Sequence, residues 1–126
     1  MTALSIITVV FVALVAGMHL YFLYMEMFAW TTLGKKTFRM LDPNLFEKTK
    51  ILAANQGLYN GFLAVGLFWS LTITDIQWSQ NVALFFLGCV VVAGLFGWAT
   101  VHFKLFLVQG VPALIPFLLI LWEKFS

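Results

Sequence analysis

Four long apolar runs dominate this chain and leave few residues for anything else. They cover roughly residues 4–30, 51–73, 82–101 and 105–122, and each approaches the ~20 residues that a helix needs to cross a bilayer. Of the 126 residues, 63% are hydrophobic and only 10% are charged, so a soluble core of this size could not cover the apolar surface. The sequence therefore predicts an all-α integral membrane four-helix bundle that forms a single domain over residues 1–126.

Basic residues predict how these spans are oriented. No Lys or Arg precedes Lys35, so the first run lacks the positive start of a cleavable signal and is expected to remain as a span. Five basic residues lie in the linker after it and Lys104 lies in the third connection, whereas Lys124 is alone on the other side. Because basic loops stay in the cytoplasm, we expect both termini on the extracytoplasmic side of a plasma (inner) membrane.

Composition also disfavours two classes of function. The basic linker contains acidic residues as well, which favours an orientation signal among anionic headgroups over a nucleic-acid site. Cys89 is the single cysteine, so neither an intrachain disulfide nor a cysteine-based metal site is expected. No metal ligands and no catalytic residues are assigned.

The second run carries a cluster of polar side chains within six residues. Carboxamides in hydrocarbon are costly unless they are hydrogen-bonded, so the cluster implies partners, a ligand or water. Helical periodicity places the four on one face, next to a face of small residues that would let another helix approach closely. Whether the cluster binds a ligand or joins helices is left open. Its members are Asn55, Gln56, Tyr59 and Asn60, and the small residues are Ala53, Gly57, Gly61 and Ala64.

Counting residues from the expected cytoplasmic end of each span gives every polar group a depth. One group in each span then lies four residues, about 6 Å, inside: Glu26, Asn55, Thr100 and Gln109. His19 and Asn60 lie near the midplane. We therefore expect Glu26 to lie at the same depth as Asn55, and His19 to lie at the same depth as Asn60. In the outer half only the hydroxyls of Thr8, Ser70 and Thr72 are polar, and these can bond to their own helix, so the polar interior should face the cytoplasm.

The predicted site draws on all these groups. Glu26 and His19 can exchange protons, although Glu26 pairing with Lys50 is the simpler alternative. In the fourth span Gln109 lies beside Gly110 and Pro112, and the proline should bend the helix and help to shape a cavity. The predicted ligand-binding residues are His19, Glu26, Asn55, Gln56, Tyr59, Asn60 and Gln109.

Several of these residues resemble the pattern of a known family. The segment AANQGLYNGFLA at residues 53–64, together with His19, Glu26 and the Gln109–Pro112 region, looks like a bacterial domain-of-unknown-function family of small four-span membrane proteins. This resemblance covers almost the whole chain and implies no activity.

A more distant resemblance is to the MAPEG family of glutathione and eicosanoid enzymes. Asn55 resembles the asparagine of that family's second-helix motif, and Gln109 resembles a glutamine early in its fourth helix. The resemblance implies a homotrimer with a site between subunits that opens to the cytoplasm, and glutathione as the cofactor. The chain departs from the family at Leu58, where the motif has a glutamate, and Arg39 is its only arginine, so the usual bidentate donors for glutathione carboxylates are missing.

Three classes of function follow. The favoured one is a membrane protein whose cytoplasm-facing pocket binds a small uncharged or amphipathic (lipophilic) ligand. The second is a MAPEG-like enzyme acting on a lipophilic substrate by thiol transfer or isomerisation, so whether the protein is an enzyme is left open. The third is a small proton-linked transporter subunit, which a lack of polar groups in the outer half disfavours.

Overall fold

The computed structural model describes residues 3–126, and within them it is helical with no strand. Four helices are long and apolar enough to cross a membrane: α1 (Ile6–Phe28), α4 (Lys50–Thr72), α5 (Ile76–Thr100) and the segment Phe103–Phe125. The predictions of an all-α chain with four membrane-crossing helices are therefore confirmed. Short elements complete the order along the chain: η1 (Trp30–Gly34), α2 (Lys35–Thr37), α3 (Leu45–Lys48), α6 (Phe103–Leu105), η2 (Phe106–Gly110) and α7 (Val111–Phe125).

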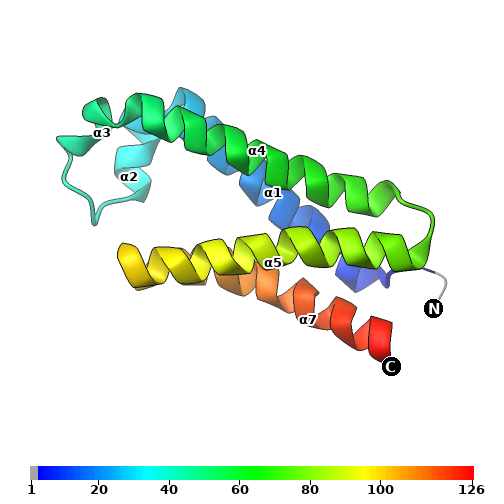
Figure 1. Cartoon of the computed structure of the whole chain (residues 1–126). Helices are drawn as coiled ribbons and strands as arrows, with labels where there is room; N and C mark the ends of the chain where they lie inside the picture. Colours follow the sequence, from blue (N-terminus) through cyan, green and yellow to red (C-terminus); the bar gives the residue numbers. More distant parts are fainter. Residues whose placement is uncertain (1–2) are drawn as a thin grey trace. The chain divides into compact units, whose positions relative to one another are not determined.

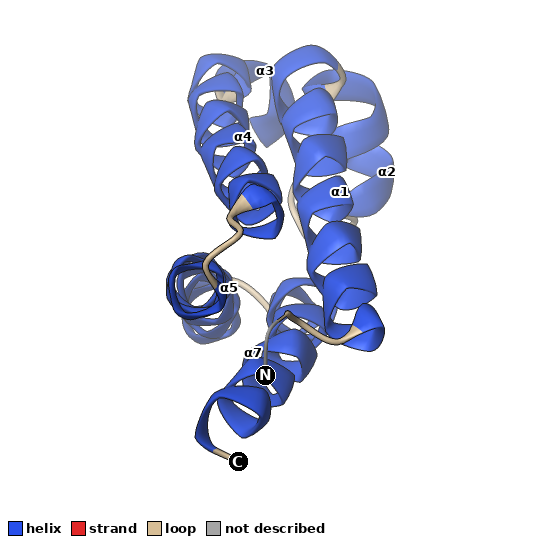
Figure 2. Ribbon diagram, turned by 90° about the vertical axis from the view of Figure 1, so that its right-hand side faces the viewer, coloured by secondary structure: helices blue, strands red, loops and turns tan. Residues whose placement is uncertain are grey.

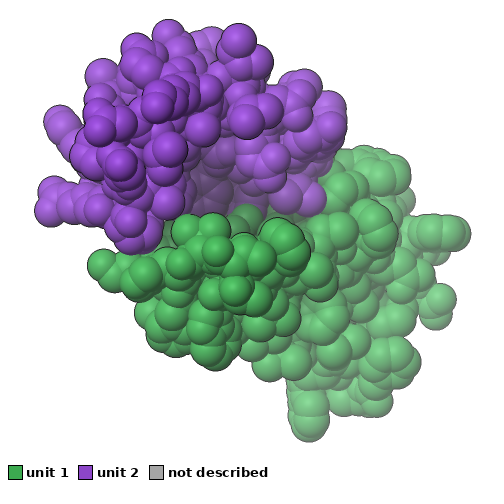
Figure 3. All heavy atoms as spheres, turned by 60° about the vertical axis from the view of Figure 1, so that its left-hand side comes forward, with its two compact units in different colours: residues 1–16, 65–126 green, residues 17–64 purple. Residues whose placement is uncertain are grey.

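The chain divides into two compact units (Figure 3). Unit 1 combines residues 1–16 with residues 65–126, and unit 2 consists of residues 17–64. The long helices α1 and α4 each contribute to both units. The expectation of a single domain stays a prediction, and each unit is described by itself below.

In unit 2, α4 packs against α1 through its small residues (Figure 2). A methyl group built on Gly57 would lie 2.7 Å from Cγ of Met27 and 3.1 Å from the carbonyl oxygen of Leu23, so a side chain larger than hydrogen would force the helices apart. Gly61 meets the same Leu23 side chain. The opposite arc of α4 is apolar and exposed, as expected for a lipid-facing surface: Ile51, Leu58, Phe62, Val65 and Trp69. The predicted small-residue face of the second span is confirmed.

In unit 1, α5 packs along η2 and α7 (Figure 1). Two glycines lie close together there, because a methyl group on Gly94 would lie 2.8 Å from both the Cα and the nitrogen of Gly110. Gly97 is similarly close to the Leu105 side chain. Gly94 and Gly97 of the third span thus allow the close helix contact.

The third span begins earlier than its apolar run suggests. Asp75 caps α5, accepting a hydrogen bond from the Trp78 backbone N–H at 3.0 Å, and the connection before it is only residues 73–75. The start of the third span that its apolar run predicts, at about residue 82, is therefore wrong, because α5 begins at Ile76. The polar residues after Asp75 are accommodated inside the helix pair: Ser79 is buried, and its hydroxyl donates to the Ser70 carbonyl at 2.7 Å.

The expected bend near Pro112 takes the form of a π-helix. The backbone N–H of Val111 donates to the Phe106 carbonyl five residues earlier, and Pro112 follows in the first turn of α7. Proline has no N–H and cannot continue the i to i−4 pattern, so the chain widens immediately before it.

Candidate functional site

The linker after the first span is built around Trp30. The indole Nε1 donates to the Thr49 hydroxyl at 3.0 Å, and the ring packs on Phe46 with centroids 4.9 Å apart and on Phe38 at 5.6 Å. Phe46 is 1% exposed. The bond and ring contacts of Trp30 connect the end of α1 to the start of α4.

A cavity of about 340 Å³ lies in unit 2 between α1, α3 and α4. Its walls are mainly apolar, and its polar groups are a carboxyl, a carboxamide and a hydroxyl. This combination is typical of small-molecule sites, which are largely apolar with a few placed polar groups. The lining residues are Glu26, Trp30, Leu41, Leu45, Phe46, Thr49, Leu52, Ala53 and Gln56.

The polar wall of this cavity is fixed by one hydrogen bond between spans. The Asn60 carboxamide Nδ2 donates to Oε1 of Glu26 at 2.8 Å, and Asn60 is only 8% exposed. Asn60 therefore holds the carboxyl group in place, while Gln56, one turn before Asn60, lines the cavity itself.

This pairing corrects the expected depths, because Asn60 rather than Asn55 meets Glu26. The first helix ends at Phe28, because the backbone leaves helical geometry at Ala29 (φ −141°, ψ 27°). Glu26 lies two residues before that end, and Asn60 lies ten residues after Lys50 at the start of α4. Counting residues from the linker therefore does not give the relative depth of the two helices.

Asn55 and Tyr59 lie outside the cavity. Asn55 is exposed, and Tyr59 is 52% exposed with its ring edge-on to Phe62 at 5.8 Å. The predicted polar face of α4 is therefore split: Gln56 lines the cavity and Asn60 is bonded to Glu26 beside it, whereas Asn55 and Tyr59 lie on the outer surface of unit 2.

His19 and Gln109 belong to different units. His19 is 0% exposed, in the unit 2 part of α1, and packs edge-on against Phe22 with ring centroids 5.2 Å apart. Gln109 is half-buried within η2 of unit 1. Their membership of one site with Glu26 stays a prediction.

A second polar cluster, in unit 1, was missed. The hydroxyls of Ser5 and Thr8 both donate to Oε1 of Glu123, Thr8 at 2.8 Å. A smaller cavity of about 130 Å³ adjoins Glu123 and is lined by Ile76, Gln77, Gln80, Glu123 and Lys124. The expectation that Thr8 bonds to its own helix is therefore wrong, because its hydroxyl bonds to Glu123 of another helix. Ser70 and Thr72 do bond to their own helix, to the carbonyls of Leu67 and Trp69.

Asp75 was the signal that could have found this cluster. An aspartate directly before an apolar run is a helix-start signal, and it would have brought Gln80 into the third span.

Thr100, by contrast, bonds the Phe96 carbonyl of its own helix and is exposed. Within residues 3–126, His, Cys, Asp and Glu do not form a group of three or more that could hold a metal ion.

Comparison with known proteins places the chain in a family. Residues 13–121 match the family described as "Protein of unknown function (DUF1304)". The "Uncharacterized protein YpaA" of Lactococcus lactis subsp. lactis (strain IL1403) is 30% identical over 111 residues, which cover 85% of this chain and 90% of that protein. No solved structure gives a significant match. The expected relationship to a family of unknown function is confirmed: this multi-pass membrane protein belongs to the DUF1304 family.

Proposed function

We propose that this protein binds a small uncharged or amphipathic molecule in the cavity of unit 2. The observation that carries the proposal is the composition of that cavity: about 340 Å³ with apolar walls and a carboxyl group held at one side. A volume of this size suits a small ligand, since small-molecule sites are about 300–1,000 Å³.

The lining residues suit a ligand that has an apolar part and a polar part. Leu41, Leu45 and Leu52 offer apolar contact, whereas Glu26 and Gln56 offer hydrogen bonds. Because Asn60 occupies only Oε1 of Glu26, the second carboxyl oxygen is available to a ligand hydroxyl or amide. The basic linker next to the cavity faces the cytoplasm by the charge rule, so the ligand enters from that side.

Two matched substitutions test the binding proposal. Leu52 lines the cavity and Ile51 does not, although both are strongly exposed, at 71% and 84%. Leu52→Trp should fill the cavity and remove a co-purified molecule from the native mass spectrum in detergent. Ile51→Trp should retain it. Equal retention by both variants, or no bound molecule in the wild type under any extraction condition, would refute the proposal.

The exposed polar groups of α4 support assembly. A carboxamide that faces lipid is costly, and Asn55 and Tyr59 lie on the outer surface of unit 2. We propose that another copy of the chain covers them in a homo-oligomer, with a trimer favoured by the MAPEG resemblance. The same native spectrum reports the number of subunits, and a monomer in mild detergent would contradict assembly.

A MAPEG-like enzyme is the second candidate. It is favoured by the position of Asn55, which resembles that family's asparagine and lies where a neighbouring subunit would complete a site. If this candidate holds, purified protein conjugates glutathione to a reactive electrophile and Asn55→Ala abolishes the reaction. Absence of conjugation by the folded oligomer would exclude it.

A further inference from the structure

The cluster around Glu123 in unit 1 contains a polar group that the fold leaves unsatisfied. Oε1 of Glu123 accepts from the Ser5 and Thr8 hydroxyls, but Oε2 is buried and has no hydrogen-bond partner within residues 3–126. A buried polar group without a partner costs about 1–3 kcal/mol. The adjoining cavity is lined by Glu123 and by the carboxamide of Gln80, a residue that is only 3% exposed. The unsatisfied oxygen beside this cavity therefore indicates a ligand that donates hydrogen bonds.

The cavity also carries both signs of charge. Glu123 and Lys124 line it together with the two glutamines, so it complements a zwitterion better than a simple cation or anion. Its volume of about 130 Å³ corresponds to roughly four water molecules at ~30 Å³ each. That space admits a two-carbon ammonium group and excludes a fatty acyl chain.

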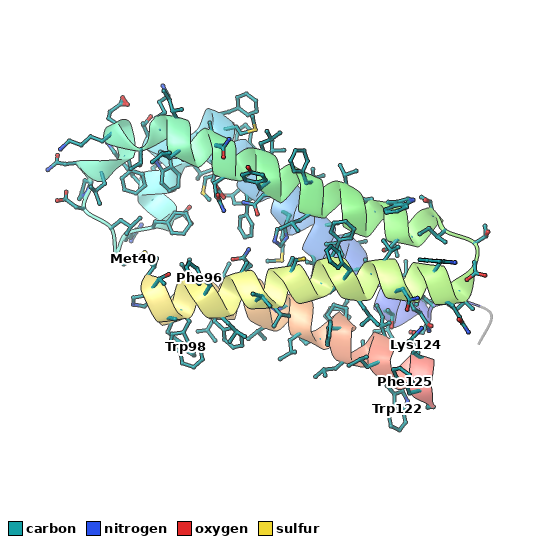
Figure 4. All side chains as sticks on the ribbon, in the orientation of Figure 1. Met40, Phe96, Trp98, Trp122, Lys124 and Phe125 are labelled. Atoms are coloured by element: carbon teal, nitrogen blue, oxygen red, sulfur yellow. The ribbon has the colours of Figure 1, made fainter. Side chains whose placement is uncertain are left out.

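Aromatic side chains place this cavity at the level of lipid headgroups. Trp78 is 64% exposed and directly follows Gln77, and Trp122 is 73% exposed and directly precedes Glu123. Exposed tryptophans at the ends of spans typically lie at the membrane interface. In Figure 4, Trp122 projects from the end of α7 away from α5, while Lys124 lies on the side toward α5.

We propose that this cavity binds the ethanolamine phosphate headgroup of an aminophospholipid. The primary ammonium group donates hydrogen bonds to Oε2 of Glu123 and to the carbonyl oxygen of Gln80. The phosphate lies toward Lys124. A choline headgroup has no N–H to donate and is bulkier by three methyl groups, so the cavity discriminates against it.

Competition between lipids tests the proposal. The protein in detergent is mixed with equal amounts of phosphatidylethanolamine, phosphatidylcholine and phosphatidylglycerol, and native mass spectrometry counts the lipids retained. We expect phosphatidylethanolamine to be retained about tenfold over each of the others, the ratio that corresponds to one well-made interaction. Glu123→Gln and Gln80→Leu should reduce this ratio toward one.

Matched controls separate recognition from folding. Glu47→Gln changes an exposed glutamate of the linker, and Asn81→Leu changes the exposed carboxamide next to Gln80; both should keep the preference. Lys124→Gln lies at the end of α7 and serves as a second test if Glu123→Gln does not fold. The proposal is overturned if the wild type retains the three lipids equally, or if folded Glu123→Gln or Lys124→Gln keeps the full preference.

A soluble ammonium phosphate carries the same charged groups as the lipid headgroup, so a separate experiment distinguishes the two ligands. If O-phosphoethanolamine raises the thermal midpoint of the wild type but not of Gln80→Leu, and no intact lipid is retained, the ligand is a soluble ammonium phosphate. Retention of the intact lipid assigns the site to the membrane. A lack of response to both probes overturns the proposal.

Discussion

Replacing Gly94 by alanine should loosen the packing of α5 on η2. The added methyl carbon would lie 2.8 Å from the Cα and from the nitrogen of Gly110, whereas carbon atoms in good contact are about 3.5–4.0 Å apart. The backbones must therefore separate by about 0.7 Å or more. Overpacking of this kind costs about 1–3 kcal/mol, and alanine returns at most about 1 kcal/mol in helix propensity. Because the obstacle is backbone that cannot rotate away, we expect a net loss of about 2 kcal/mol.

Gly88 provides a control within the same helix. A methyl group there would meet only Cε2 of Phe117 at 3.6 Å, an ordinary contact, so Gly88→Ala should be neutral or stabilising by up to about 1 kcal/mol. Both variants are unfolded in detergent with increasing sodium dodecyl sulfate and followed by circular dichroism. If Gly94→Ala is as stable as Gly88→Ala, the glycines do not set the distance between these helices and the reasoning fails.

Three further predictions concern single hydrogen bonds. A double-mutant cycle with Glu26→Met and Asn60→Leu should give a coupling free energy of about 0.6–1.7 kcal/mol, the range for hydrogen bonds between membrane helices. Zero coupling in the same unfolding assay would mean that the 2.8 Å bond between Asn60 and Glu26 does not persist. Asp75→Ala should lower stability by about 0.5–2 kcal/mol through loss of the α5 cap, while Asp75→Asn should stay close to wild type, and an equal loss in both would point to charge instead. Trp30→Phe keeps the ring but removes the bond to Thr49, so protease cleavage of the linker should become faster, and an unchanged rate would contradict its role in holding the linker.

The spans and faces were predictable because they depend on composition and helical period alone. The lipid-facing arc of α4 and its small-residue face follow from residues repeated every three or four positions. The start of α5 was misplaced because hydropathy was weighed above the cap: Gln77 and Gln80 look like a turn by polarity, but Asp75 satisfies the helix start and Ser79 is paired with Ser70.

The cavity of unit 2 was only partly predictable. Glu26, Gln56 and Asn60 were identified, because carboxyl and carboxamide groups in an apolar run are conspicuous. The other walls come from the linker, whose fold places Leu41, Leu45 and Phe46 beside the cavity. The conformation of this linker cannot be predicted from the periodicity of apolar residues.

Glu123 was missed for a different reason. It lies near the end of the last apolar run, where a charge is ordinary, and only the structure shows that Ser5 and Thr8 approach it.

The π-helix η2 has a consequence for every residue that follows it. A π-turn holds one more residue than an α-turn, and one residue in an α-helix corresponds to a rotation of about 100°. Deleting one residue from Phe106–Gly110 would let the segment relax to regular α-helix while α7 keeps its face, whereas relaxation with every residue retained would turn the whole of α7 by about that angle around its axis. Glu123 would then swing away from Ser5 and Thr8 while the composition of α7 stayed the same. The π-helix therefore determines which face of α7 is directed toward Ser5 and Thr8.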